Sequence, residues 1–248
     1  MPFTVSHVVA VLPLRRVPWL PTSALVIGSM APDSPSMVGA LRWRDSTHTL
    51  AGAMTTDVAI TAVGCVLWAW VLRPVVADLV PALAARWRPS VQPRRPLVVQ
   101  GLLWYLAAAI GCLTHVVWDA FTHPGGAEGG WIPLDGVNAH TYAQLQLLSS
   151  VLGIVILAWW TARWWRAHPP IAHSEPGTPA VRHRRSAVAL VVVAAGALWA
   201  ATDRALTGGR AGQQVLVDLG FGALAGALVG ALLVAVVYRL TLLRGRST

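Results

Sequence analysis

Lysine is absent from the 248-residue sequence, so all 19 of its basic residues are arginine. Charge of either sign is also scarce. Asp, Glu, Lys and Arg together make up 12% of the chain, about half of what a soluble domain usually carries. Hydrophobic residues make up 55%. This balance argues against a soluble protein and favours a polytopic membrane protein.

Cysteine and phenylalanine are also rare. The two cysteines, Cys65 and Cys112, lie inside apolar segments and lack the spacing of a metal site. This argues against a disulfide framework and favours small packing residues. Thirteen tryptophans stand against three phenylalanines, and many of them lie near the ends of apolar runs. Tryptophan is enriched at membrane–water interfaces, where its ring and its N–H are both satisfied.

The chain is rich in long apolar segments. Five of them reach the length of about 20 residues that a helix needs to cross a bilayer. We therefore predict an all-α fold, a polytopic integral membrane helical bundle with about five spanning helices plus short N-terminal helices. The predicted spans are Leu50–Leu72, Leu97–Trp118, Ala143–Trp165, Ser186–Thr202 and Val215–Tyr238.

A segment rich in proline, arginine and histidine separates the third and fourth predicted spans. Its composition is typical of a solvated linker, so we interpret His168, His173 and His183 as solvated side chains. The expected organisation is a helical membrane domain over residues 1–165, a cytoplasmic linker over 166–185 and a C-terminal transmembrane hairpin over 186–248.

The arginines are unevenly distributed, and this orients the predicted bundle. The connections 73–96 and 163–185 hold five arginines each and the tail holds three, whereas the connection 119–142 holds none. Since basic residues favour the cytoplasmic side, we predict a multi-pass protein of the cell membrane with a cytoplasmic C-terminus. The net charge of +9 lies in membrane-flanking loops, so nucleic acid is not an expected partner.

The first fifty residues contain two apolar stretches that are too short to span a membrane. One interpretation is a cleaved signal peptide with Arg15 and Arg16 as its basic region. Pro18 and Pro21 interrupt its apolar part. We therefore prefer two short helices in the outer leaflet, which keeps His7 in the mature protein.

Three possible metal ligands stand at the end of the second predicted span. His115, Asp119 and His123 are four residues apart, so a helix places them along one slowly drifting stripe. Imidazole nitrogen and carboxylate oxygen are the usual non-sulfur ligands of zinc and related ions. The pattern is equally compatible with a hydrogen-bonded core residue at His115 and a helix-end residue at Asp119.

Further ionisable residues fall on the same predicted side of the membrane. His7, Asp33, His48 and His140 lie at ends of apolar segments that the topology brings to the outer face. Ionisable groups near the hydrocarbon are costly and usually mark function, and one cation offers all of them a partner. Asp57 lies nine residues after His48, on the opposite side of an ideal helix, and we predict a separate packing or hydrogen-bonded group there.

The segments PFTVSH, LPTSALVIGSMAPD and HVVWDAFTH together resemble a family of bacterial polytopic membrane proteins of unknown function. That family opens with the same Pro-Phe-Thr-x-Ser-His signature and is similar to the membrane-bound metal-dependent hydrolases regulated by the SOS repressor. More distantly, it resembles the all-α zinc-dependent phospholipase C. The resemblance implies metal ligands at His7, Asp33, His48, His115 and Asp119, with His123 and His140 matching further zinc ligands of the phospholipase.

The resemblance implies a membrane-embedded metal-dependent hydrolase that acts on a phosphoester or lipid-like substrate at the extracytoplasmic face. Its cofactor would be a divalent metal, zinc above all, and Asp33 or Asp119 would bridge ions or act as base toward a metal-bound water. Gln144 stands where the phospholipase pattern has a glutamate, which favours one or two ions over three. The alternatives are a non-catalytic membrane scaffold with a structural metal site and a metal-ion carrier.

A stripe of small residues marks the last predicted span. Gly222, Gly226 and Gly230 recur every four residues, and Asp218 continues the stripe one turn earlier. Small residues permit close helix contact in membranes. We expect this stripe to pack within the bundle or to form a homodimer. The other expected partners are membrane lipid and a small-molecule or lipid substrate.

Overall fold

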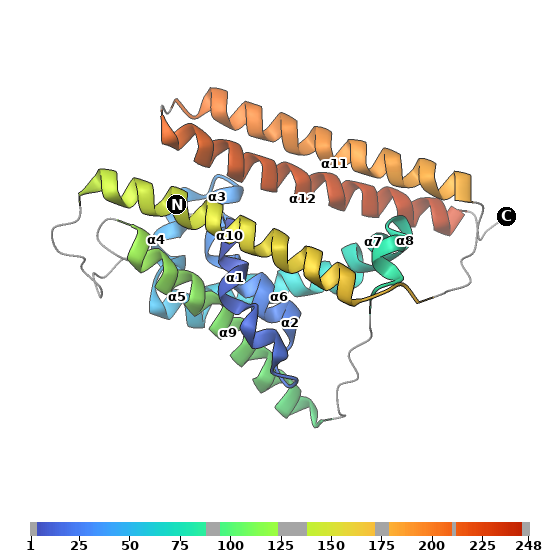
Figure 1. Cartoon of the computed structure of the whole chain (residues 1–248), viewed down its shortest axis with the longest axis horizontal. Helices are drawn as coiled ribbons and strands as arrows, with labels where there is room; N and C mark the ends of the chain where they lie inside the picture. The colour runs from blue at the N-terminus through green and yellow to red at the C-terminus, as the bar shows by residue number, and fades with distance from the viewer. Residues whose placement is uncertain (1–3, 88–94, 124–137, 172–178, 210–211, 245–248) are drawn as a thin grey trace. The chain divides into compact units, whose positions relative to one another are not determined.

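The computed structural model describes residues 4–87, 95–123, 138–171, 179–209 and 212–244. These residues form helices and connecting turns, with no strand among them (Figure 1). The chain divides into two compact units. The first comprises Met1–Cys65 and Ser90–Arg163, and the second comprises Val66–Pro89 and Trp164–Thr248.

Five helices in the described part of the chain are long and apolar enough to cross a membrane. They are Thr56–Leu79, Leu97–Thr122, Ala139–Ala167, His183–Thr207 and Gln214–Thr241. In a bilayer a helix satisfies all of its backbone hydrogen bonds internally, so five such helices indicate a multi-pass membrane protein. The predicted all-α fold with about five spanning helices is confirmed.

The first candidate span begins later than predicted. The prediction started it at Leu50, but the chain forms a separate short helix, α5 (Leu50–Met54), before α6 (Thr56–Val66). Thr55 separates the two helices because its backbone leaves the helical region, with φ −128° and ψ −82°. The span therefore starts after this break, at Thr56.

The same span also continues beyond its predicted end at Leu72. A π-helical turn, η5 (Leu67–Leu72), leads into α7 (Arg73–Leu79). Pro74 follows just after this turn, so its missing N–H falls where the helix already departs from regular α-helical hydrogen bonding. The proline is thus accommodated inside a continuous candidate span. A last short helix, α8 (Pro81–Ala84), follows it.

The first unit begins with a series of short helices, as predicted for the N-terminal part. They are η1 (Thr4–His7), α1 (Val8–Val11), η2 (Pro13–Arg16), α2 (Thr22–Gly28), η3 (Ala31–Asp33), α3 (Ser34–Met37), η4 (Leu41–Trp43) and α4 (Arg44–Thr47). Prolines in the first turns of η2, η3 and α3 favour these starts, since proline is tolerated there. Two long helices, α9 (Leu97–Thr122) and α10 (Ala139–Ala167), complete the described elements of this unit.

Helix α2 packs directly against α9 at two glycines. A Cβ atom on Gly28 would lie 2.6 Å from the carbonyl oxygen of Ala108, and one on Gly111 would lie 2.5 Å from the carbonyl oxygen of Leu25. Neither position has room for a side chain, so the two backbones approach closely, as membrane helices do at small residues. Because Ser29 follows α2 immediately, this contact also fixes the main chain beside the site described below.

In the second unit, α11 (Pro179–Thr207) and α12 (Gln213–Arg244) lie side by side as an antiparallel pair (Figure 1). The predicted glycine stripe of α12 faces α11. Gly222 and Gly226 meet the main chain of Ala200 and Gly196, and a Cβ atom on Gly230 would lie 3.0 Å from the Cα atom of Val193. The stripe packs within the chain, and a homodimer through it stays a prediction.

The second unit also includes the end of the first candidate span. Val75 and Leu79 of α7 form a small apolar core with Ala235 of α12, and the Ser186 hydroxyl donates a hydrogen bond to the Leu79 carbonyl. The predicted linker 166–185 is helical at both described ends, since α10 reaches Ala167 and α11 begins at residue 179. His173 lies outside the described residues. The predicted three-part division stays a prediction.

Candidate metal centre

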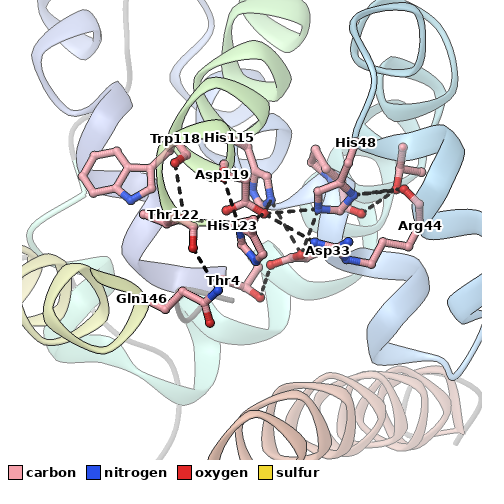
Figure 2. A network of polar contacts seen from close by, with 12 residues as sticks. Thr4, Asp33, Arg44, His48, His115, Trp118, Asp119, Thr122, His123 and Gln146 are labelled. Atoms are coloured by element: carbon pink, nitrogen blue, oxygen red, sulfur yellow. Dashed lines mark hydrogen bonds and ion pairs between the residues drawn. The ribbon is translucent and has the colours of Figure 1, made fainter. Parts of the chain in front are cut away.

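Four buried side chains of the first unit converge near the end of α9 (Figure 2). Asp33 ends η3, His48 follows α4, and His115 and Asp119 lie one turn apart on α9. One ligand atom of each side chain lies within 4.8 Å of those of the other three, so this group could hold a metal ion. We call these residues the Asp33–His48–His115–Asp119 group.

Each imidazole Nε2 atom of the group contacts both carboxylates. His48 Nε2 lies 3.4 Å from Asp33 Oδ1 and 3.5 Å from Asp119 Oδ2. His115 Nε2 lies 3.6 Å and 3.7 Å from the same two oxygens. Zinc binds nitrogen and oxygen at about 2.0–2.2 Å, so neighbouring ligands of a tetrahedral ion are about 3.3–3.6 Å apart. The four nitrogen–oxygen distances match that separation closely.

The second nitrogen of each ring faces a main-chain carbonyl. His115 Nδ1 lies 2.8 Å from the carbonyl oxygen of Ser29, and His48 Nδ1 lies 3.2 Å from that of Arg44. A carbonyl oxygen only accepts, so Nδ1–H donates and the neutral ring keeps its Nε2 lone pair for an ion. Metal-binding histidines usually have such an outer contact.

The carboxylate of Asp33 has an outer contact of its own. The Thr4 hydroxyl donates a hydrogen bond of 2.7 Å to Asp33 Oδ2, while Oδ1 faces the two imidazoles. One oxygen is therefore held by the protein and the other points into the group. This division of roles is usual for a carboxylate that binds a metal, because the outer hydrogen bond orients the ligating oxygen.

The inward-facing atoms have no hydrogen-bond partner in the described structure. They are Nε2 of His48 and His115, Oδ1 of Asp33 and Oδ2 of Asp119. A buried polar atom left unpaired costs about 1–3 kcal/mol, and more if it is charged. One cation would compensate all of them. A hydrogen-bonded core histidine explains Nδ1 of His115 but leaves its Nε2 atom unexplained.

His123 borders the group without lying on the same helical stripe. Helix α9 ends at Thr122, and His123 follows it in extended conformation (φ −122°, ψ 143°). Its Nδ1 atom lies 3.1 Å from the carbonyl oxygen of Asp119 and 3.6 Å from Asp119 Oδ2. Burial lowers the pKa of His123 to about 4, which keeps the ring neutral at pH 7. Its role as a ligand stays a prediction.

His7 is buried beside the group, next to the Oδ1 atom of Asp119, whereas His48 and His115 contact its Oδ2 atom. Its ring stacks on that of His115, with centroids 3.8 Å apart, and its Nε2 atom lies 3.5 Å from Asp119 Oδ1. Burial, reinforced by the neighbouring His115, lowers the pKa of His7 to about 3. The neutral ring is the form that binds metals. The structure thus brings His7 next to the group as a neighbour of Asp119, and its ligand role stays a prediction.

His140 lies apart from the group. It is an exposed residue in the first turn of α10, and its Nε2 atom lies 3.0 Å from Nε2 of Gln144. The structure therefore brings six of the seven predicted ligands together and leaves His140 outside.

Two members of the group outside the candidate spans have opposite pKa shifts. Burial alone would raise the pKa of Asp33, but the nearby imidazoles of His115 and His48 outweigh it and hold that pKa well below its usual range. Burial alone would lower the pKa of His48, but the carboxylates of Asp119 and Asp33 outweigh it and raise that pKa. A carboxylate beside an imidazolium is the arrangement in which a divalent cation replaces a proton.

Two neighbours of the group were not identified as site residues from the sequence. Thr4 orients Asp33, and Arg44 places its guanidinium Nη2 atom 3.7 Å from Asp119 Oδ2. Arg44 lies four residues before His48 in a helical segment, so its position one turn away is a signal that could have indicated it. Nothing local connects Thr4 with Asp33, because 29 residues separate them.

Asp57 is a fully buried side chain that does not belong to the group. Neither of its carboxylate oxygens has a hydrogen-bond partner in the described structure, and its own main-chain carbonyl accepts a bond from the Thr61 hydroxyl. Its predicted role as a packing or hydrogen-bonded group stays a prediction.

These features define a multi-pass, all-α membrane protein with a buried Asp–His group that could bind a metal ion. The model of the domain of unknown function DUF4184 matches residues 1–236, and the chain belongs to this family. No curated protein and no solved structure matches the chain.

Proposed function

We propose that the protein is a membrane-embedded metal-dependent hydrolase whose metal ion is held by the Asp33–His48–His115–Asp119 group. The observation that carries the proposal is the convergence of four buried ligand atoms, with both histidine Nδ1 atoms directed to main-chain carbonyls. A bound divalent ion, zinc for preference with this nitrogen and oxygen set, would lower the pKa of a bound water and polarise a phosphoryl or carbonyl oxygen.

The two carboxylates have different surroundings, and this supports different roles. Asp33 has one oxygen engaged by Thr4 and the other directed at both imidazoles, so we assign it as a ligand. Asp119 directs Oδ2 at the same imidazoles, whereas its Oδ1 lies 3.5 Å from His7 Nε2, its one ion pair among the described residues. We assign Asp119 Oδ1 as the acceptor of the proton from the attacking water.

The surroundings of the group favour an amphiphilic substrate. Val38 (78% exposed), Trp43 (52%) and Leu50 (52%) lie on the segments that carry Asp33 and His48. Exposed apolar side chains on the segments that also carry the polar centre suit a phosphoester with a lipid-like tail. The group lies near the end of α9 that leads into the arginine-free connection, so we place it at the extracytoplasmic face of the cell membrane.

A structural metal ion is the second candidate, because the four side chains are at most 3% exposed. Closed, fully coordinated sites usually have a structural role, whereas catalytic sites keep one position open. In that case the ion would hold η3, α4 and α9 together without performing chemistry.

The experiment combines metal stoichiometry with a hydrolysis assay on the purified protein. We expect one or two divalent ions per wild-type chain, a large loss in His115→Ala and Asp119→Ala, and full occupancy in the control Asp57→Asn. The assay uses chromogenic phosphomonoesters and phosphodiesters. Metal with no hydrolysis would support the structural ion, and full metal in His115→Ala would exclude both functions.

A further inference from the structure

The guanidinium of Arg44 is a partly exposed cation beside the metal-binding group. Its side chain is 28% exposed, whereas Asp119, which it approaches at 3.7 Å, is 2% exposed. Figure 2 shows Arg44 and His48 reaching the centre from the same side. Arg44 therefore lies at the border between the buried group and its surroundings.

Arg44 has unused hydrogen-bonding capacity. Its distance to Asp119 is longer than a hydrogen bond, and its buried Nε atom has no hydrogen-bond partner in the described structure. Arginine carries five N–H donors in a planar fork that matches the oxygens of phosphate. By contrast, the guanidinium of Arg15, in the same unit, lies over the ring of Trp160, 4.8 Å from its centroid.

The charges of the site also favour an anion. A bound divalent ion would balance the carboxylates of Asp33 and Asp119, and neutral histidines would add no charge. Arg44 would then leave the site with one net positive charge at the border of a buried centre, where it attracts a negative group. With a metal ion bound, Asp119 would no longer need Arg44 as its counter-ion, since the metal would take that role.

We propose that Arg44 is a substrate-binding residue that takes the phosphate group of the substrate at the metal-loaded centre. This inference rests on the proposed function and narrows its substrate class to phosphate esters. A bidentate contact through the fork would hold two phosphate oxygens while a third faces the ion. The same chemistry fits a free phosphate compound and a lipid phosphate.

The test measures metal content first and phosphate binding second. Wild type, Arg44→Gln, Arg44→Lys and the control Arg15→Gln are purified in detergent and loaded with zinc, and inorganic phosphate is titrated by calorimetry. We expect full metal in all four. Arg44→Gln should bind phosphate about tenfold more weakly or worse, because a hydrogen bond to a charged group is lost. Arg44→Lys should bind phosphate several-fold more weakly than wild type, and Arg15→Gln should bind it with wild-type affinity.

A second pair of titrations separates the two sources of phosphate. Short-chain phosphatidic acid carries the phosphate on a lipid, and short-chain diacylglycerol lacks it. An effect of Arg44→Gln on phosphatidic acid alone would identify a lipid phosphate, and an effect on both anions would identify the phosphate group itself. Diacylglycerol binding should not change.

The possible failures are distinguishable. If wild type binds no metal, the proposed function fails and this inference falls with it. If Arg44→Gln keeps its metal and binds both anions as wild type does, only the inference is overturned. If Arg44→Gln loses its metal, Arg44 has a structural role toward Asp119 and the inference is also overturned. If Arg44→Gln does not fold, Arg44→Lys decides, and wild-type affinity in that variant contradicts the proposal.

Discussion

The imidazole rings of His7 and His115 stack at a centroid distance of 3.8 Å, with 20° between their planes. Both residues are buried, so two protonated rings at this distance would repel each other in surroundings of low dielectric. The folded protein therefore keeps His7 neutral, which is the state that a metal-binding site requires.

Burial of His7 and His123, reinforced at His7 by the His115 ring, makes the stability of the metal-free protein depend on pH. His7 and His123 have pKa values of about 3 and about 4 in the folded state, below the ordinary value of 6.5. Between these values and pH 6.5 the unfolded chain binds more protons than the folded one, so stability should fall as the pH is lowered from 7 to 5. Thermal melting of metal-free protein at both pH values checks this.

The control for this prediction is His7→Gln, in which the melting temperature of the metal-free protein should depend less on pH than in wild type. His48 opposes the effect only in the upper part of this range. Its pKa is raised, so near pH 6.5 and above the folded chain holds a proton that the unfolded chain releases, whereas well below pH 6.5 both states hold it and His48 no longer changes stability. A melting temperature that rises on acidification to pH 5 would contradict the prediction.

Removal of the Thr4 hydroxyl should weaken metal binding without removing a ligand. Thr4→Val leaves Asp33 Oδ2 without its 2.7 Å hydrogen bond, so the ligating oxygen is less well oriented. Loss of such an outer contact typically costs 10–100-fold in metal affinity, and we expect about tenfold. Thr4→Ser keeps the hydroxyl, so its metal affinity should be close to that of wild type. Competition with a chelator of known affinity measures the metal affinity of both variants. Equal metal affinities of Thr4→Val and wild type would show that the Thr4–Asp33 hydrogen bond has no influence on metal binding.

The glycine contact between α2 and α9 should be intolerant of substitution. A Cβ atom on Gly111 would lie 2.5 Å from the Leu25 carbonyl oxygen, so Gly111→Ala should destabilise the protein by about 1–3 kcal/mol and lower its metal content. Gly101, also on α9, is the matched control, because a Cβ atom there meets nothing within 4 Å. Gly101→Ala should be neutral or slightly stabilising. Similar melting temperatures for the two variants would exclude this close contact.

The predicted orientation is tested by labelling. Gly129 lies in the arginine-free connection after α9, outside the described residues. Gly129→Cys, in a background with Cys65 and Cys112 replaced by alanine, should react with an impermeant thiol reagent in intact cells. The background without the new cysteine is the control. Labelling only after permeabilisation would place this connection in the cytoplasm.

Retention of the N-terminal residues can be checked by the intact mass of the purified protein. Thr4 and His7 contact the metal-binding group, and Ser6 packs against Gly153 of α10. We therefore expect the segment Met1–Ala31 to stay attached. A mature chain that begins at Pro32 would lack these contacts, and its metal affinity would have to come from the remaining residues.

The parts of the fold and site that follow from short-range rules were predictable. Five spans follow from apolar length, and His115 and Asp119 share a face because the helical period is local. The convergence of Asp33 and His48 on them was predicted from topology together with the family resemblance. The ends of the first span were not predicted, because neither the break at Thr55 nor the π-helical turn has a clear signal in an apolar sequence.

The contacts that orient the ligands were beyond sequence analysis for a different reason. The Ser29 carbonyl reaches His115 across 86 residues of sequence, and a carbonyl is present at every position of the chain. No residue type marks it. Arg44 was also missed. Its position one helical turn before His48 was a usable signal, but only the structure places Asp119 beside it.

Main-chain carbonyls orient both histidines, and this determines which residues around the site can be substituted during evolution. Because any amino acid supplies a carbonyl, residues 29 and 44 can be exchanged without removing these two hydrogen bonds. Selection on ligand orientation therefore acts on the path of the backbone, and hence on Gly28 and Gly111, which determine how closely α2 approaches α9. Descendants of this protein should diverge at position 29 sooner than at either glycine, and comparison of orthologous sequences can measure this.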